Sequence, residues 1–151
     1  MSARSRVAAP GVRHLVVVLG DQLDAGSAAL DGFEPASDLI WMAEVAGESE
    51  HVVSSKVRTA LFLSAMRHFR DAQRSLGRTV RYVELEDAGN THTLAGEVAR
   101  VVAELRPAGY IGTPSFLKII VEKAADMQVA LPSLQRALVS GEAFVPSLRD
   151  W

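Results

Sequence analysis

The chain has 151 residues, of which 48% are hydrophobic, 23% are charged and 6% are aromatic. A chain of this length buries roughly two-thirds of its unfolded surface, which is enough for one domain with its own core. The formal net charge of −2 disfavours a domain that serves nucleic acid alone, because such domains carry a basic excess. The lack of cysteine excludes disulfides, thiolate zinc sites, cysteine-ligated iron–sulfur clusters and cysteine nucleophiles within these residues.

The chain contains no apolar run close to the roughly 20 residues of a membrane span. Residues 1–10 include arginines but no long apolar stretch, which argues against a signal peptide. We therefore expect a cytoplasmic protein with no membrane contact. The charge is uneven along the chain. Residues 14–50 contain acidic side chains and no Lys or Arg, whereas residues 51–82 are mostly basic. The basic segment is either a solvated helix face or a positive surface for an anion or a partner.

Short apolar runs rich in β-branched residues alternate with amphipathic stretches. The runs predict buried strands at residues 14–19, 38–45, 79–85, 109–112 and 137–139. The amphipathic stretches predict helices at residues 54–76, 93–105 and 114–127. In the longest helix we expect a buried stripe of Val57, Leu61, Ala65, Phe69, Ala72 and Leu76, widened by Phe62 and Met66. This order predicts an α/β fold, a Rossmann-like doubly wound parallel sheet with helices on both faces.

Ligands of doubly wound sheets bind outside the carboxyl ends of the strands, so the residues after each strand are the candidates. After the first strand these are Gly20, Asp21, Gln22 and Leu23. Glu44 ends the second strand, His51 lies in the loop that follows it, and residues 86–90 follow the third. Asp21 either has a local role, forming an Asx-turn or capping the next helix, or accepts hydrogen bonds from a polar heterocycle together with Glu44. His51 either contacts the ligand or faces solvent.

Motifs of familiar chemistry are missing from the sequence. It has no G-x-G-x-x-G, no G-x-x-x-x-G-K-[ST] and no G-x-S-x-G. Its four histidines lack metal-ligand spacing, so we predict neither a catalytic residue nor a metal ligand. Trp41, within the second strand, is expected in the core rather than as a stacking platform.

Four segments in the first two-thirds of the chain resemble one family. They are V-V-L-G-D-Q-L (17–23), M-A-E-V (42–45), F-L-S-A-M-R-H-F (62–69) and E-D-A-G-N-T-H-T-L-A-G-E-V (86–98). In type, order and spacing they resemble the photolyase-related family, the prokaryotic branch of the cryptochrome/photolyase superfamily, over about residues 13–107. The resemblance implies a Rossmann-like domain that binds an antenna chromophore, a ribityl-lumazine or a flavin.

The same resemblance places Gly20, Asp21, Gln22 and Leu23 on the first loop of the antenna pocket and Glu44 on the second. The chain reads H-V-V-S-S-K at 51–56 where many members carry Y-V-x-H-H-K, so His51 replaces an aromatic residue. The family's helical domain binds FAD, carries an iron–sulfur cluster and repairs DNA photolesions. We expect neither FAD, nor the cluster, nor direct nucleic-acid binding in this chain, which by itself would be inactive.

Beyond Pro107 the sequence resembles a different family. Residues 109–124 and 131–150 are similar to an internal segment of adenylate-forming ligases of the phenylacetate–CoA ligase type, in which Ser140–Ala143 would lie near the adenine pocket. The plainer interpretation of Ser140–Ala143 is a strand-ending turn. We thus expect a flexible stretch at 1–12, a photolyase-related domain at 13–107 and a tail at 108–151 that completes the sheet or stays mobile. Three functions remain open: a truncated, chimeric antenna domain, a ligase fragment, or a folded fragment without a ligand.

Overall fold

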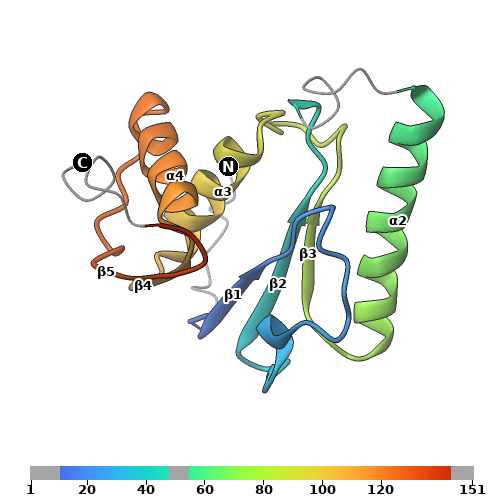
Figure 1. Ribbon diagram of the computed structural model, residues 1–151, viewed down its shortest axis with the longest axis horizontal. Coiled ribbons are helices and arrows are strands. Elements are labelled where there is room, and N and C mark those ends of the chain that lie inside the picture. The colour runs from blue at the N-terminus through green and yellow to red at the C-terminus, as the bar shows by residue number, and fades with distance from the viewer. Residues whose placement is uncertain (1–10, 48–54, 144–151) are drawn as a thin grey trace, which may run out of the picture. The chain divides into compact units, whose positions relative to one another are not determined.

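A computed structural model describes residues 11–47 and 55–143, in which strands and helices alternate (Figure 1). This confirms the predicted α/β class. The first part of the chain forms β1 (His14–Val17), the 3-10 turn η1 (Ala28–Leu30), β2 (Asp38–Ala43), α2 (Lys56–Ser75) and β3 (Val80–Val83). The second part forms α3 (Leu94–Leu105), β4 (Gly109–Gly112), α4 (Pro114–Asp126) and β5 (Arg136–Val139). The strands are shorter than the apolar runs that predicted them, except β4, whose bounds agree, and β5, which begins one residue earlier.

The first three strands form a sheet in the order β1-β2-β3, and β1 runs parallel to β2 with Val16 opposite Ile40. Ile40, Trp41 and Met42 on β2 are all buried. Successive strand residues point to opposite faces of a sheet, so both faces of β2 are covered. This explains why the strand is a continuous apolar run rather than an alternating one.

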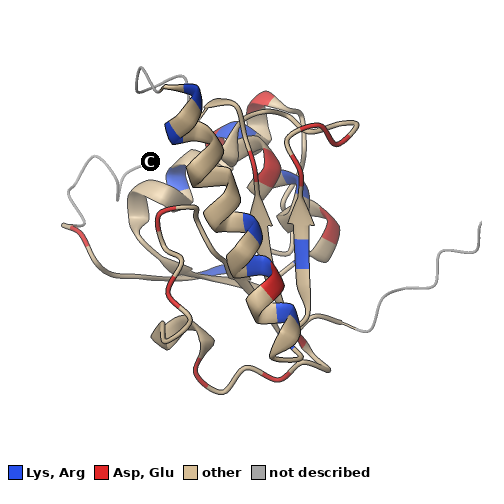
Figure 2. Cartoon of the chain, turned by 90° about the vertical axis from the view of Figure 1, so that its right-hand side faces the viewer, with Lys and Arg blue, Asp and Glu red and all other residues tan. Residues whose placement is uncertain are grey.

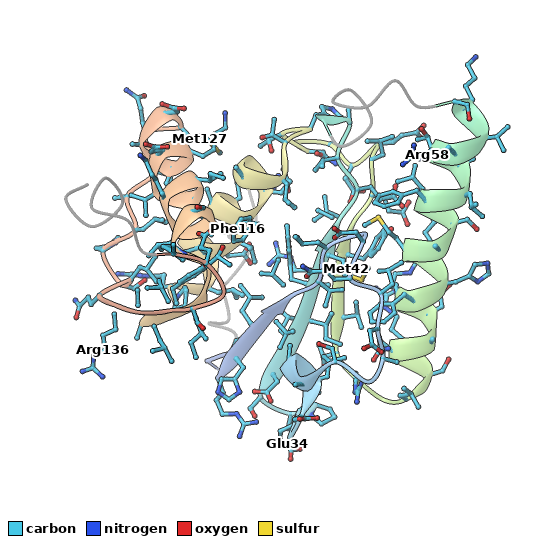
Figure 3. All side chains as sticks on the ribbon, in the orientation of Figure 1. Glu34, Met42, Arg58, Phe116, Met127 and Arg136 are labelled. Atoms are coloured by element: carbon cyan, nitrogen blue, oxygen red, sulfur yellow. The ribbon has the colours of Figure 1, made fainter. Side chains whose placement is uncertain are left out.

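The chain divides into two compact units, Met1–Met42 with Ala60–Tyr82 and Ala43–Thr59 with Val83–Trp151, called unit 1 and unit 2 below. In unit 1, α2 covers one face of the sheet (Figure 1). The side chain of Met42 lies on that face, toward α2 (Figure 3). The core of unit 1 consists of Val18, Leu30, Ile40, Met42, Met66, Phe69 and Val80.

The predicted buried stripe of α2 is wrong in part. The buried residues of the helix are Met66, Phe69 and Gln73, whereas Leu61 and Leu76 are 71% and 65% exposed. The helix carries two apolar rows on adjacent sides, and only one of them can face the sheet. The row with the larger aromatic and thioether side chains is buried, because it removes more apolar surface from water.

Unit 2 contains the parallel pair β4–β5, in which Ile111 lies opposite Leu138. Helix α4 connects these two strands, and it packs against α3. Both helices begin as the sequence predicts. Thr93 caps α3 by accepting a hydrogen bond from the amide of Gly96, and Pro114 occupies the first turn of α4. The described part of the expected tail thus forms a β-α-β segment, whose two strands pair with each other in a two-stranded sheet.

Asp38, at the start of β2, binds two segments of unit 1 that precede it in the sequence. Its carboxylate accepts hydrogen bonds from Arg13 Nε at 2.9 Å and from the Glu34 amide at 2.8 Å. A second nitrogen of the Arg13 guanidinium completes a two-pronged ion pair. The hydrogen bond from Arg13 holds the pKa of Asp38 well below its usual range, and the Glu34 amide acts in the same direction.

This lowered pKa predicts an acid-sensitive contribution to stability. A carboxyl whose pKa is lowered by folding stabilises the protein above its unfolded pKa of about 4, and this stability is lost as the pH falls toward the folded pKa. We expect the melting temperature of the wild type to fall between about pH 5 and pH 2 more steeply than that of Asp38→Asn. Thermal melts across this pH range test the prediction. Parallel curves of melting temperature against pH for the two proteins would contradict it.

Candidate functional site: the loops after the strands

The loop after β1, in unit 1, contains the predicted residues Gly20, Asp21, Gln22 and Leu23. The amide of Gln22 donates to the Leu19 carbonyl at 2.9 Å, which closes a tight turn. This turn leaves the side chains of Asp21 and Gln22 exposed. Leu23 is half-buried and packs against the core of unit 1. The loop therefore presents two polar side chains to solvent beside an apolar one that anchors it.

Gly20 lies where the loop comes close to two side chains of α2. A Cβ atom at this position would overlap the Phe62 ring and would lie 2.9 Å from Met66 Sδ, both on α2. The missing side chain thus lets the loop and the helix approach closely. The Asx-turn that was one interpretation of Asp21 is made instead by Asp24, whose carboxylate accepts from the Gly26 amide at 2.8 Å.

Glu44, in unit 2, is 1% exposed at the end of β2. Its amide donates to the Val83 carbonyl at 2.9 Å, which continues the pairing with β3. Its carboxylate oxygen Oε2 accepts a hydrogen bond from the amide of Leu85 at 3.0 Å. A buried carboxylate needs such partners, and the loop after β3 supplies this one.

Asn90 ties the loop after β3 to the end of β2. Its Nδ2 donates to the carbonyl of Glu44 at 2.8 Å and to that of Glu84 at 2.9 Å. Its Oδ1 accepts from the His92 amide at 2.8 Å, and the His92 carbonyl accepts from Gly47 at 3.0 Å. From the sequence, Asn90 is expected only as one of residues 86–90 after the third strand. Its place in the E-D-A-G-N motif is the signal that could have indicated this structural role.

The later part of the same motif is also structural. Glu97 is buried on α3, and its Oε1 accepts from the Thr91 amide at 2.7 Å and from Arg100 at 2.8 Å. A Cβ atom on Gly96 would overlap the Thr91 hydroxyl. The Gly-Glu pair of the motif therefore shapes the start of α3.

The structure thus brings Glu44 together with the loop of residues 84–92 in unit 2, and it places Gly20–Leu23 in unit 1. His51 lies outside the described residues. Within residues 11–47 and 55–143, no group of three or more His, Asp or Glu side chains could hold a metal ion. No helix in that part of the chain is long and apolar enough to cross a bilayer.

The turn at Ser140–Ala143 has a local role in unit 2. Glu142 Oε1 accepts a hydrogen bond from the Ser115 amide at 2.5 Å in the first turn of α4. This bond lowers the pKa of Glu142. The amide of Ser140 donates to the Gly112 carbonyl at 3.0 Å, next to the parallel pair. These contacts favour a strand-ending turn that caps a helix.

Parallel strands followed by polar loops at their carboxyl ends define an α/β domain of the Rossmann-like type. The family described as "Deoxyribodipyrimidine photo-lyase-related protein" matches residues 16–136. The chain belongs to this photolyase-related family. The match continues past residue 107 into the segment expected to be a separate tail, and the resemblance of that segment to adenylate-forming enzymes is not shown.

A curated relative points to the same family. A "(6-4) photolyase" of Agrobacterium fabrum (strain C58 / ATCC 33970) is 43% identical over 95 residues. The similar region covers 63% of this chain and 19% of the relative, so the chain spans about a fifth of that protein.

Proposed function

We propose that this chain is the antenna-chromophore-binding domain of a light-driven DNA repair enzyme, with a ribityl-lumazine or a flavin as its ligand. The observation that carries the proposal is the family match over residues 16–136, which includes both Gly20–Leu23 and Glu44. In this proposal the residues of the chain bind and orient the chromophore and carry no catalytic step.

The side chains of these loops suit a polar heterocycle. Lumazines and flavins carry ring N–H and ribityl hydroxyl groups, which are hydrogen-bond donors for carboxylates. Asp21 and Gln22 are exposed on the first loop. When bound, the chromophore would absorb near-ultraviolet or blue light and pass on the excitation.

A titration with ribityl-lumazine, followed by the change in its fluorescence, tests the proposal. We expect saturable binding by the wild type and about tenfold weaker binding by Asp21→Asn, because the charged acceptor is lost at nearly constant shape. Asp24→Asn is the matched control. Asp24 is an exposed aspartate of the same loop whose carboxylate already accepts from Gly26, so its replacement should leave the affinity unchanged.

Two results would count against this assignment. One is a wild type that binds neither ribityl-lumazine nor flavin mononucleotide while its circular dichroism shows a folded α/β protein. The other is an equal loss of chromophore affinity in Asp21→Asn and Asp24→Asn. That result would show that the affinity depends on the overall charge of the loop and not on a contact made by Asp21.

A further inference from the structure

His92, in the loop between β3 and α3, has an unusual backbone conformation. Its φ of 57° lies in the left-handed region, which few residues other than glycine enter, although histidine does so more readily than most. Conformations of this kind raise the free energy of the folded chain and persist only where the surrounding structure fixes them, most often at functional sites. The conformation of His92 therefore needs a physical cause.

Two loops of unit 2 hold the backbone of His92. Its amide donates to Asn90 Oδ1 at 2.8 Å, and its carbonyl accepts from the Gly47 amide at 3.0 Å. Asn90 is itself buried and donates to the carbonyls of Glu44 and Glu84. His92 is thus attached through Asn90 to the end of β2, and through Gly47 to the loop that follows this strand.

The imidazole of His92, in contrast to its backbone, is exposed. Within residues 11–47 and 55–143 it makes no hydrogen bond or ion pair. The loop that carries it is closed by further bonds. Asp87 Oδ2 accepts from the Glu84 amide at 2.8 Å, and the Asn90 amide donates to the Asp87 carbonyl at 2.9 Å. A side chain on a loop held in this way is pre-organised, so less entropy is lost when it binds a ligand.

The imidazole supplies a hydrogen-bond donor. Carboxylates such as that of Asp21 are acceptors and suit the N–H and hydroxyl groups of a ribityl-lumazine or a flavin. The rings of these chromophores also carry carbonyl oxygens, which need donors. A neutral imidazole has an N–H in either tautomer, and both ring nitrogens carry one when it is protonated. An exposed histidine at the carboxyl end of a strand is therefore chemically suited to a ring carbonyl.

We propose that His92 donates a hydrogen bond from its imidazole to a ring carbonyl oxygen of the chromophore. This inference rests on the proposed antenna function, and it adds a donor from the loop after β3. In this account the left-handed backbone places the imidazole toward the ligand. The bonds from Asn90 and Gly47 hold that conformation before the chromophore binds.

Titration of the full chain with ribityl-lumazine tests the role of His92. Glycine adopts a positive φ without strain, so His92→Gly should melt within about 2 °C of the wild type and yet bind at least about fivefold more weakly. His92→Asn should restore part of the affinity, because asparagine tolerates the same conformation and carries an N–H donor. The absorption maximum of the bound chromophore should differ between the wild type and His92→Gly, since the hydrogen bond acts on a conjugated carbonyl. A purely structural role would not shift that maximum.

His68→Ala is the matched control. His68 is an exposed histidine on α2, the long helix that faces the viewer in Figure 2, so its loss should leave the affinity for ribityl-lumazine unchanged. Equal binding by the wild type and His92→Gly, or equal weakening by His92→Gly and His68→Ala, would overturn the role of His92 and leave the antenna proposal standing. So would a fall of more than about 5 °C in the melting temperature of His92→Gly, since the histidine would then be structural. A folded wild type that binds neither ribityl-lumazine nor flavin mononucleotide would overturn both.

Discussion

Replacing Trp41 with alanine is expected to lower the free energy of unfolding by about 3–5 kcal/mol. Trp41 lies in β2 and is 1% exposed. Its side chain points to the face of the sheet opposite to that of Ile40 and Met42, because strand residues alternate. Removing the indole leaves a large cavity in a region where the neighbouring strand residues are also buried. Urea unfolding followed by circular dichroism measures the loss.

Two variants show whether this loss comes from the cavity. Leu138→Ala removes an exposed leucine from β5 and should change the free energy of unfolding by less than about 0.5 kcal/mol. Trp41→Phe keeps most of the apolar volume and should cost less than half as much as Trp41→Ala. If the unfolding free energy of Trp41→Ala stays within about 1 kcal/mol of that of the wild type, the core role of Trp41 is contradicted. The interpretation of Trp41 as a stacking platform would then be favoured.

Asn90→Ala is expected to destabilise the protein by about 2–4 kcal/mol. The side chain makes hydrogen bonds to the carbonyls of Glu44 and Glu84 and to the His92 amide. Asn90 itself is buried, and unsatisfied buried groups each cost about 1–3 kcal/mol, with less than full additivity. The same urea titration measures the effect.

The variant Glu86→Ala is the control for this loop. Glu86 is exposed and lies four residues before Asn90, so its loss should change the unfolding free energy by less than about 0.5 kcal/mol. Equal effects of Asn90→Ala and Glu86→Ala would show that the loop is not held by the asparagine side chain.

The local parts of the fold could be predicted from the sequence because local chemistry decides them. The cap at Thr93 follows from side-chain hydrogen bonding, and the stop after α2 follows from Gly77, which adopts a positive φ of 76°. The buried side of α2 could not be predicted in the same way. Leu61 and Phe62 both belong to apolar rows, and only the position of the sheet decides which row is covered.

The candidate site, too, could be predicted from the sequence only in part. Glu44 ends an apolar strand, which predicts that its carboxylate needs a hydrogen-bond partner. A backbone amide in the loop after β3 is one such partner. The identity of that partner, Leu85, depends on how the ends of β2 and β3 are aligned, which no sequence pattern encodes. The Asx-turn lies at Asp24 rather than at Asp21, because both aspartates of this loop can form it with little difference in local propensity. The roles of Asp21, Gln22 and His51 toward a ligand stay predictions.

Hydrogen exchange with and without saturating ribityl-lumazine tests most directly whether the loops after the strands bind the chromophore. If they do, exchange slows at the amides of residues 20–24 and 84–92, while that of residues 136–142 on β5 and its following turn is unchanged. Protection that appears only at residues 136–142, or nowhere although the protein is folded, would contradict an antenna site at the carboxyl ends of the strands.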